Sequence, residues 1–288
     1  MKLTTFDPGN GPRTGVLTDE GMLDAGLVLG ETGTPTLREL IAADRIAELG
    51  ARIEAGDRSF PDEALFEPAS VRLLPPVTDP DKIICIGLNY RSHAEEFNLE
   101  LPKAPTIFGK YRNALTGDGS TVTLPPASGK VDFEAEIAFV IGKRAKEVEV
   151  QSALGHVAGY TLLNDLSARD LQFLTPQWMP GKVFDGSAPC GPWLVTPEEA
   201  GSHDSIGISL TLNGEEMQSS GSGDLIFSVP ELVSHLSNWM TLEPGDIIST
   251  GTPSGVGSAR KPRIWLEDGD ELTVSSPQLG NLRTRVAR

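Results

Sequence analysis

The sequence has 288 residues, of which 39% are hydrophobic and 22% charged, and it contains 31 glycines and 22 prolines. This length allows one large domain or two smaller ones with a core that needs no disulfide bonds, and the frequent turn-forming residues favour a β-rich architecture. Forty acidic residues against 24 basic ones give a formal charge of −16. Such a charge repels phosphate backbones and anionic membrane surfaces, which argues against nucleic acid as a partner.

The sequence carries no recognisable signal for export or membrane insertion. Its first residues, MKLTTFDPGNGPRTG, lack the apolar segment of a signal peptide, and no window approaches the roughly 18 consecutive apolar residues of a membrane span. Cys85 and Cys190 are too few for a disulfide framework and are expected to be free thiols. We therefore expect a cytoplasmic protein with no membrane partner.

The first part of the chain predicts a small module of strands and one helix. Short strands are expected at residues 3–6, 14–18 and 22–29. The last two form a hairpin across Asp19-Glu20-Gly21. Thr36 and Glu39 have the spacing of a capping box, which predicts a helix that ends near Gly56.

A proline-rich stretch separates this module from the rest of the chain. Residues 57–81 have the composition of a linker, so we place a small N-terminal domain at residues 1–74 and a catalytic domain at residues 75–288. Residues 82–88 and 137–141 are continuous apolar runs, which predicts strands that are buried on both faces.

A later helix is expected to begin at Ser228, because Pro230 and Glu231 suit its first turn. Its apolar residues would point inward: Leu232, Val233, Leu236, Trp239 and Met240.

Three acidic residues alternate along the chain directly before the buried run at 137–141: Asp132, Glu134 and Glu136. The period of a strand places them on one face. Buried carboxylates that lie close together raise one another's pKa, so a site that keeps them ionised needs a cation between them. An all-oxygen ligand set favours Mg²⁺, Mn²⁺ or Ca²⁺ over zinc. The alternative is a solvated strand end with its acidic residues in water.

Further charged residues follow a short strand expected at residues 160–163. The strand ends in Asn164-Asp165, and Lys182 comes later in the chain. A lone Asp after a strand is usually a turn former or a helix cap. However, three carboxylates, a divalent ion and one lysine would bring the local charge close to zero, which makes a buried charged site tolerable. This interpretation requires that the residues converge in the fold.

His93 and Glu96 lie three residues apart in the segment that follows the strand at 82–88, where loops carry function. On a helical turn this spacing makes them neighbours, so that the carboxylate fixes the imidazole tautomer and raises its basicity. The alternative is an exposed histidine without a role.

The glycine-rich stretch from Gly251 to Gly257 lacks the Lys-Ser or Lys-Thr of a phosphate-binding loop. Two interpretations stay open: a turn whose backbone N–H groups bind a substrate carboxylate, and a plain tight turn.

An ordered set of short motifs runs from residue 82 to about residue 285. It consists of Asn89-Tyr90, Asp132-Phe133-Glu134-Ala135-Glu136, Gly159-Tyr160, Asn164-Asp165, Ser167-Ala168-Arg169-Asp170, Gly181-Lys182, Asn213-Gly214-Glu215 with Gln218, Leu242-Glu243-Pro244-Gly245-Asp246, Thr250-Gly251-Thr252-Pro253-Ser254-Gly255-Val256-Gly257 and Asp268-Gly269-Asp270. This set resembles the fumarylacetoacetate hydrolase family, and in particular its shorter bacterial and mitochondrial branch.

The resemblance implies a mainly β, α+β fold: a mixed β-sheet roll as the catalytic domain, with a small α/β N-terminal domain, assembled as a homodimer. It implies that Glu134, Glu136 and Asp165 bind Mg²⁺ or Mn²⁺, with Ca²⁺ as a substitute in crystals. It also implies catalytic roles for His93 and Glu96, on a lid, and for Lys182. Substrate contacts are implied at Tyr90, Arg169, Gln172 and Thr252.

We therefore expect a metal-dependent hydrolase that cleaves a carbon–carbon bond of an acylpyruvate-like 2,4-dioxo acid to pyruvate and a carboxylic acid, with His93 taking a proton from water. A first alternative keeps the site but decarboxylates oxaloacetate or isomerises a 2-oxo-3-ene dioate through the same enolate. A second is a protein that binds a metal or a small acid without turnover. The sequence leaves the substituent beyond C4 open, because loops form its pocket.

Overall fold

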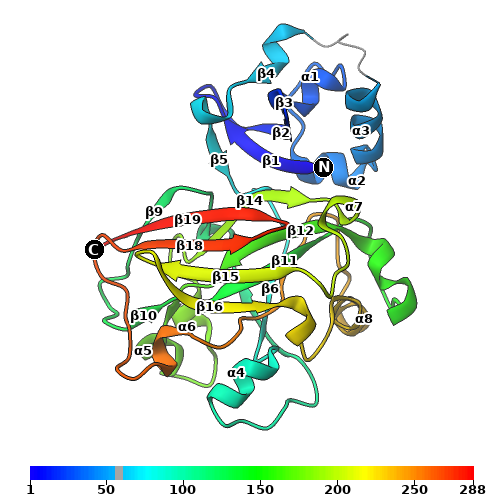
Figure 1. The fold of residues 1–288 in the computed structure, drawn as a ribbon. Coiled ribbons are helices and arrows are strands. Elements are labelled where there is room, and N and C mark those ends of the chain that lie inside the picture. The colour runs from blue at the N-terminus through cyan, green and yellow to red at the C-terminus, as the bar shows by residue number, and fades with distance from the viewer. Residues whose placement is uncertain (56–60) are drawn as a thin grey trace.

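The computed structural model describes residues 1–55 and 61–288, and sheets dominate it (Figure 1). The strands are β1 (Lys2–Asp7), β2 (Arg13–Thr18), β3 (Gly21–Asp24), β4 (Leu65–Phe66), β5 (Arg72–Leu74), β6 (Ile83–Gly87), β7 (Thr106–Lys110), β8 (Leu115–Thr116), β9 (Ser120–Thr123), β10 (Val131–Asp132), β11 (Ala135–Ile141), β12 (Val157–Asn164), β13 (Ser167–Ala168), β14 (Ala188–Val195), β15 (Gly207–Leu212), β16 (Glu215–Gly221), β17 (Ile247–Ser249), β18 (Glu271–Ser276) and β19 (Gly280–Ala287). The α-helices are α1 (Ala25–Val28), α2 (Leu37–Ala42), α3 (Ile46–Glu54), α4 (Arg91–Glu96), α5 (Arg169–Gln172), α6 (Met179–Lys182), α7 (Pro197–Ala200) and α8 (Val229–Trp239). The 3₁₀ helices are η1 (Asp62–Ala64), η2 (Pro68–Ser70), η3 (Arg112–Ala114), η4 (Val150–His156), η5 (Ser222–Asp224) and η6 (Gly257–Ala259).

The largest sheet has 12 strands and continues from the N-terminal module into the rest of the chain. Its order is β4-β3-β2-β1-β14-β12-β11-β17-β6-β7, with β5 beside β1 and β8 beside β14. A five-stranded sheet, β16-β15-β18-β19-β9, and a two-stranded pair, β10-β13, accompany it. Most neighbours are antiparallel, whereas β17 with β6, β14 with β8 and β19 with β9 are parallel. The predicted mixed-sheet α+β fold is confirmed.

The apolar core has two parts, one on each face of the large sheet. Along β11, Ile137 and Phe139 belong to the cluster shared with the five-stranded sheet and α8, whereas Ala138 and Val140 belong to the cluster shared with the N-terminal helices. Successive side chains along a strand point to opposite faces of the sheet, and here each face is covered by one part of the core. β11 is therefore apolar at all four of these positions. This explains the continuous apolar run at residues 137–141.

The N-terminal module differs in detail from the predicted one. The hairpin of β2 and β3 forms as expected, and Thr36 with Glu39 makes the capping box of α2. The strand expected at residues 22–29 ends at Asp24, because the Asp24 side chain accepts a hydrogen bond from the Leu27 N–H and starts α1. The prediction of a single helix after Thr36 is also wrong, because Asp44, with φ at 55°, separates α2 from α3.

The segment predicted as a linker takes part in the sheet. Its described part, residues 61–81, carries β4 and β5, which pair with β3 and β1. Residues 57–60 of that prediction lie outside the described residues. The division into residues 1–74 and 75–288 stays a prediction, as does the homodimer.

The helix predicted from Ser228 is present as α8, and it buries Leu232, Val233 and Leu236. Trp239 is 58% exposed, contrary to expectation, because it is the last residue of the helix and its ring packs on His235 one turn earlier. Both cysteines are buried free thiols, as predicted. Within residues 1–55 and 61–288, no helix combines the length and the apolar character that crossing a bilayer requires.

Replacing Leu162, fully buried in β12, with alanine should lower the free energy of unfolding by about 2–5 kcal/mol, because a cavity opens between the two sheets. The matched change Leu154→Ala, at a side chain that is 40% exposed, should alter it by about 0.5 kcal/mol or less. Urea titration of both variants measures the difference. Equal losses would contradict this description of the core.

Candidate active site

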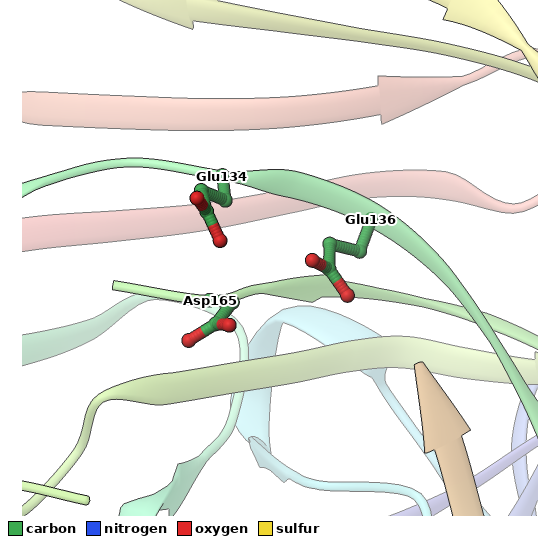
Figure 2. Close-up of side chains that lie close together, drawn as sticks. All are labelled: Glu134, Glu136 and Asp165. Carbon is green, nitrogen blue, oxygen red and sulfur yellow. The ribbon is translucent and has the colours of Figure 1, made fainter. Parts of the chain in front are cut away.

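Three acidic side chains meet where β11 and β12 pair. Ala135 lies opposite Asn164 in the antiparallel register, which places Glu134 and Asp165 side by side just beyond the two strands. The Asp165 N–H donates to the Glu134 carbonyl at 2.9 Å and so fixes this approach. One carboxylate oxygen from each of Glu134, Glu136 and Asp165 lies within 4.8 Å of the other two, and all three residues are buried. Figure 2 shows the side chains of Glu134 and Glu136 pointing from the chain at the start of β11 toward Asp165.

Two lysines lie against this triad. The ammonium group of Lys182, at the end of α6, donates to Glu134 at 2.7 Å, to Asp165 at 2.8 Å and to the Ser167 hydroxyl at 2.6 Å. Lys110, at the end of β7, forms an ion pair with the other oxygen of Asp165 at 2.8 Å. These contacts hold the pKa of Lys182 above its usual value although burial opposes this, so its charge is retained.

Arg169 connects the triad to a fourth buried carboxylate. Its guanidinium donates to Asp132 and to Glu134, both at 2.6 Å, and to the Gln172 side-chain oxygen at 3.0 Å. Burial would raise the pKa of Glu134, but Arg169 and Lys182 together lower it below the ordinary range. Asp132 therefore belongs to the site through Arg169 and not as a member of the triad.

Glu136 is the carboxylate that these cations do not contact. It accepts hydrogen bonds from the Ser249 hydroxyl and, at 3.2 Å, from the Gly251 N–H. Burial, together with the charges of Asp165 and Glu134, raises its pKa well above the usual value. A neutral Glu136 is what burial enforces when no further cation is present.

The charges of the site suit a divalent cation. Four buried carboxylates face three cationic side chains: Asp132, Glu134, Glu136 and Asp165 against Lys110, Arg169 and Lys182. A carboxylate offers about four lone pairs, so the oxygens that already accept from a lysine or arginine can still coordinate a metal. The triad thus fits a hard, oxygen-loving ion, with Glu136 as the ligand that most requires it.

His93 and Glu96 form the pair that their spacing predicts. Both lie on α4, and His93 Nδ1 is 3.1 Å from the Glu96 carboxylate, which can only accept, so Nδ1 carries the proton. The other Glu96 oxygen accepts from the Gly255 N–H at 2.8 Å. Asp224 holds the start of the helix by accepting from the Ser92 N–H at 3.1 Å. In the neutral imidazole, this tautomer leaves Nε2 as the nitrogen that can act as a base.

The glycine-rich turn binds carboxylates of the protein itself. Its N–H groups at Gly251, Gly255 and Ser258 donate to Glu136, Glu96 and Asp132 respectively. At Gly255, where φ is +105°, a Cβ would lie 2.1 Å from the Met217 carbonyl oxygen, so a side chain does not fit. One turn thus positions a triad ligand, the partner of His93 and the partner of Arg169.

A cavity of about 190 Å³ brings these groups together. Its polar wall contains His93, Glu134, Glu136, Arg169, Gln172, Lys182 and Thr252, and its apolar wall contains Ile86, Leu88, Phe97, Leu99, Phe108, Phe173 and Trp178. Asp165 and Glu96 contact this wall from behind, through Lys182 and His93.

The residues predicted to contact the substrate differ in whether they line the cavity and in the hydrogen bonds that they already make. Gln172, Thr252 and Arg169 line the cavity, but Arg169 already holds two carboxylates. The Thr252 hydroxyl donates its proton to the Ala135 carbonyl at 2.9 Å, so in this arrangement the Thr252 oxygen can act toward other groups only as an acceptor. Tyr90 is fully buried and does not line the cavity. Their contacts with a substrate stay predictions.

Several functional neighbours were missed by sequence reasoning. Lys110 and Ser249 are single polar residues at the ends of β7 and β17, and no spacing marks them. Phe108 lies under the Lys182 ammonium group, 5.0 Å from nitrogen to ring centroid, and packs on Trp178. Only the topology of the sheet could reveal these contacts, because each joins segments far apart in the sequence.

Adding Mg²⁺ or Mn²⁺ to protein freed of metal should raise its melting temperature, since an ion that binds only the folded state stabilises it by about 2.7 kcal/mol at 100 times its Kd. Glu136→Gln keeps the size of the protonated side chain but removes the ligand charge, so the shift should be lost. The control Glu147→Gln, at a side chain that is 74% exposed, should keep it. Thermal denaturation with and without the ion measures this, and an undiminished shift in Glu136→Gln would exclude the triad as the metal site.

Comparisons with known proteins show which family the chain is similar to. Residues 82–287 match the family model described as fumarylacetoacetate hydrolase C-terminal. Among curated proteins, the human mitochondrial oxaloacetate tautomerase FAHD2A is 38% identical over 292 residues, covering 99% of this chain and 91% of that protein.

Two solved structures are similar over the full length of the chain. The fumarylacetoacetate hydrolase of Exiguobacterium antarcticum superposes with a TM-score of 0.84 at 32% identity, covering 100% of each chain. The 5-carboxymethyl-2-hydroxymuconate delta-isomerase of Mycobacterium smegmatis superposes with a TM-score of 0.78 at 31% identity, covering 100% of this chain and 99% of that one. The chain therefore belongs to the fumarylacetoacetate hydrolase family.

Proposed function

We propose that this protein is a divalent-metal-dependent enzyme that interconverts the keto and enol forms of a 2-oxo acid, with oxaloacetate as the substrate to test first. The observation that carries the proposal is the cavity itself, which is lined by Glu134 and Glu136 of the acidic triad and by the histidine of the His93–Glu96 pair. The similarity to the human oxaloacetate tautomerase, which extends over 99% of the chain, supports this reaction over the carbon–carbon bond hydrolysis expected from the sequence.

Glu134, Glu136 and Asp165 would hold Mg²⁺ or Mn²⁺, and such an ion, when bound, polarises the C2 carbonyl and stabilises charge that develops on its oxygen. Together with such an ion, Lys182, Arg169 and Lys110 would outweigh the four carboxylates, so that this end of the cavity could receive an acid. Since Lys182 and Arg169 are held by carboxylates and retain their charge, they act as fixed positive charges near the substrate.

His93 would carry the proton. From the keto form, Nε2 removes a proton from C3, the electrons of the C3–H bond form the C2=C3 double bond, and the C2 oxygen gains negative charge. Proton transfer to that oxygen gives the enol, and the reverse order gives the ketone. Glu96 stabilises the imidazolium that forms in between, because it accepts the hydrogen bond of Nδ1.

The apolar wall has a part in this chemistry. Phe97, Phe108 and Trp178 line the cavity together with the charged groups, and they would keep water away from C3. Exclusion of water strengthens each electrostatic contact in the cavity.

Hydrolysis of a 2,4-dioxo acid is the second candidate function. The same imidazole could take a proton from water instead of carbon, and the similar structure from Exiguobacterium antarcticum is a hydrolase by its title. Keto–enol exchange is favoured because it requires one proton carrier and no bound water. Decarboxylation of oxaloacetate would use the same enolate and is distinguished by release of CO₂.

Purified enzyme with Mg²⁺ should accelerate the decay of enol oxaloacetate, followed by its ultraviolet absorbance, without a matching release of CO₂. An acylpyruvate assayed in parallel should yield little pyruvate. Chelation should abolish the acceleration. Pyruvate release from the acylpyruvate with no effect on enol decay would instead establish the hydrolase.

His93→Ala should lower kcat for tautomerisation by about 100-fold or more, because positioned general base catalysis contributes that much, while KM changes little. His203→Ala, outside the cavity, serves as the matched control. Steady-state kinetics of both variants measures the effect. A kcat unchanged in His93→Ala would remove the imidazole from the reaction.

A further inference from the structure

Glu136 differs from the other two acidic residues of the triad in the groups that hold its carboxylate. Glu134 and Asp165 each present both carboxylate oxygens to cationic side chains, namely Lys110, Arg169 and Lys182. Glu136 has two neutral donors instead, the Ser249 hydroxyl and the Gly251 N–H. The orientation of this carboxylate is therefore set by hydrogen bonds and not by ion pairs.

Both neutral donors act on the same oxygen of Glu136. The Ser249 hydroxyl and, at 3.2 Å, the Gly251 N–H donate to Oε2. In the described part of the chain, the other oxygen, Oε1, accepts no hydrogen bond. Figure 2 shows one carboxylate oxygen of Glu136 turned toward Glu134 and Asp165 and the other turned away from Glu134. The lone pairs of Oε1 thus stay free for an ion.

The sheet places Ser249 where this contact forms. β17 lies between β11 and β6, and Ser249 is opposite Ala138 of β11 in the antiparallel register. Glu136 is two residues before Ala138, so its side chain is on the same face and diagonal to that of Ser249. Both side chains are buried, and Ser249 is fully so. A hydroxyl on this interior strand keeps its place because neighbouring strands pair with β17 on both sides.

A neutral donor suits this position better than a further lysine would. A cation on Glu136 would offset the negative charge that attracts an ion, whereas a hydroxyl orients the carboxylate and leaves that charge in place. Removing a group that holds a metal ligand from behind typically weakens metal binding by roughly 10- to 100-fold. Among the described residues, the Ser249 hydroxyl makes no other hydrogen bond, so its contact with Glu136 is the one it supplies.

We infer that Ser249 is a positioning residue, which holds Glu136 Oε2 so that Oε1 faces the ion of the triad, and that its hydroxyl thereby sets the affinity of the site for Mg²⁺ or Mn²⁺. The inference rests on the proposed function for the presence of the ion. Ser249 is not among the residues that line the cavity, so it acts through Glu136 and not on the substrate.

Ser249→Ala tests this inference, with Mn²⁺ titrated into protein freed of metal and the unbound ion counted by its EPR signal. The Kd for Mn²⁺ should rise by about tenfold or more, because Glu136 loses the donor that orients it. Ser249→Thr keeps the hydroxyl on a strand that suits a β-branched residue, and its Kd should stay close to that of the unaltered protein. Ser237→Ala, which removes a fully buried hydroxyl in α8, is the matched control and should leave the Kd unchanged.

An unchanged Kd in Ser249→Ala would overturn the inference, as would an equal rise in Ser249→Thr, which would trace the effect to packing. Urea unfolding of the metal-free variants records any loss of stability separately. A lower free energy of unfolding in Ser249→Ala with an unaltered Kd would give the hydroxyl a structural role alone.

The decay of enol oxaloacetate, measured at saturating Mn²⁺ on the same samples, tests the proposed function apart from the inference. A raised Kd in Ser249→Ala, with no acceleration of the decay by the unaltered protein, would reject the reaction and keep Ser249 as a positioning residue. Acceleration of the decay with the same Kd in both proteins would keep the reaction and reject the role of Ser249.

Discussion

The structure depends on the burial of more negative than positive charge at one end of β11 and β12. Asp132, Glu134, Glu136 and Asp165 are at least nine-tenths buried, and three cationic side chains lie against them. Removing carboxylates from water is costly unless each finds a partner, and Glu136 finds only a hydroxyl and an N–H donor. A divalent ion would resolve this imbalance, and it would also supply the electrophile that the proposed chemistry of a 2-oxo acid requires.

The fold meets this constraint with very few elements. The register of β11 and β12 brings Glu134 to Asp165, and α6 delivers Lys182 to both. The glycine-rich turn after β17 then holds Glu136, Glu96 and Asp132 through backbone N–H groups, which every residue type except proline provides. One proposed metal ligand, Glu136, and the partner of the proposed proton carrier, Glu96, are therefore positioned by the same backbone segment. A small displacement of this turn would affect both.

Sequence reasoning identified residues of the candidate site where the pattern was local or where the ordered motifs were specific. The alternation that ends in Glu136 and the spacing of His93 with Glu96 predicted contacts that depend on the period of a strand or a helix. It missed contacts where distant segments meet: Lys110 reaches Asp165 across the sheet, and Arg169 binds two carboxylates besides lining the cavity. In the N-terminal module the errors came from single residues, Asp24 capping α1 and Asp44 ending α2, which periodicity does not detect.

The most direct measurement of the central claim is anomalous diffraction from crystals grown with Mn²⁺. The account predicts one peak among the oxygens of Glu134, Glu136 and Asp165, at about 2.1 Å from each, as hard-cation coordination requires. It further predicts that Lys182 stays beside the site as a fixed charge. A peak elsewhere, or a triad bridged only by the Lys182 ammonium group at saturating Mn²⁺, would contradict the account.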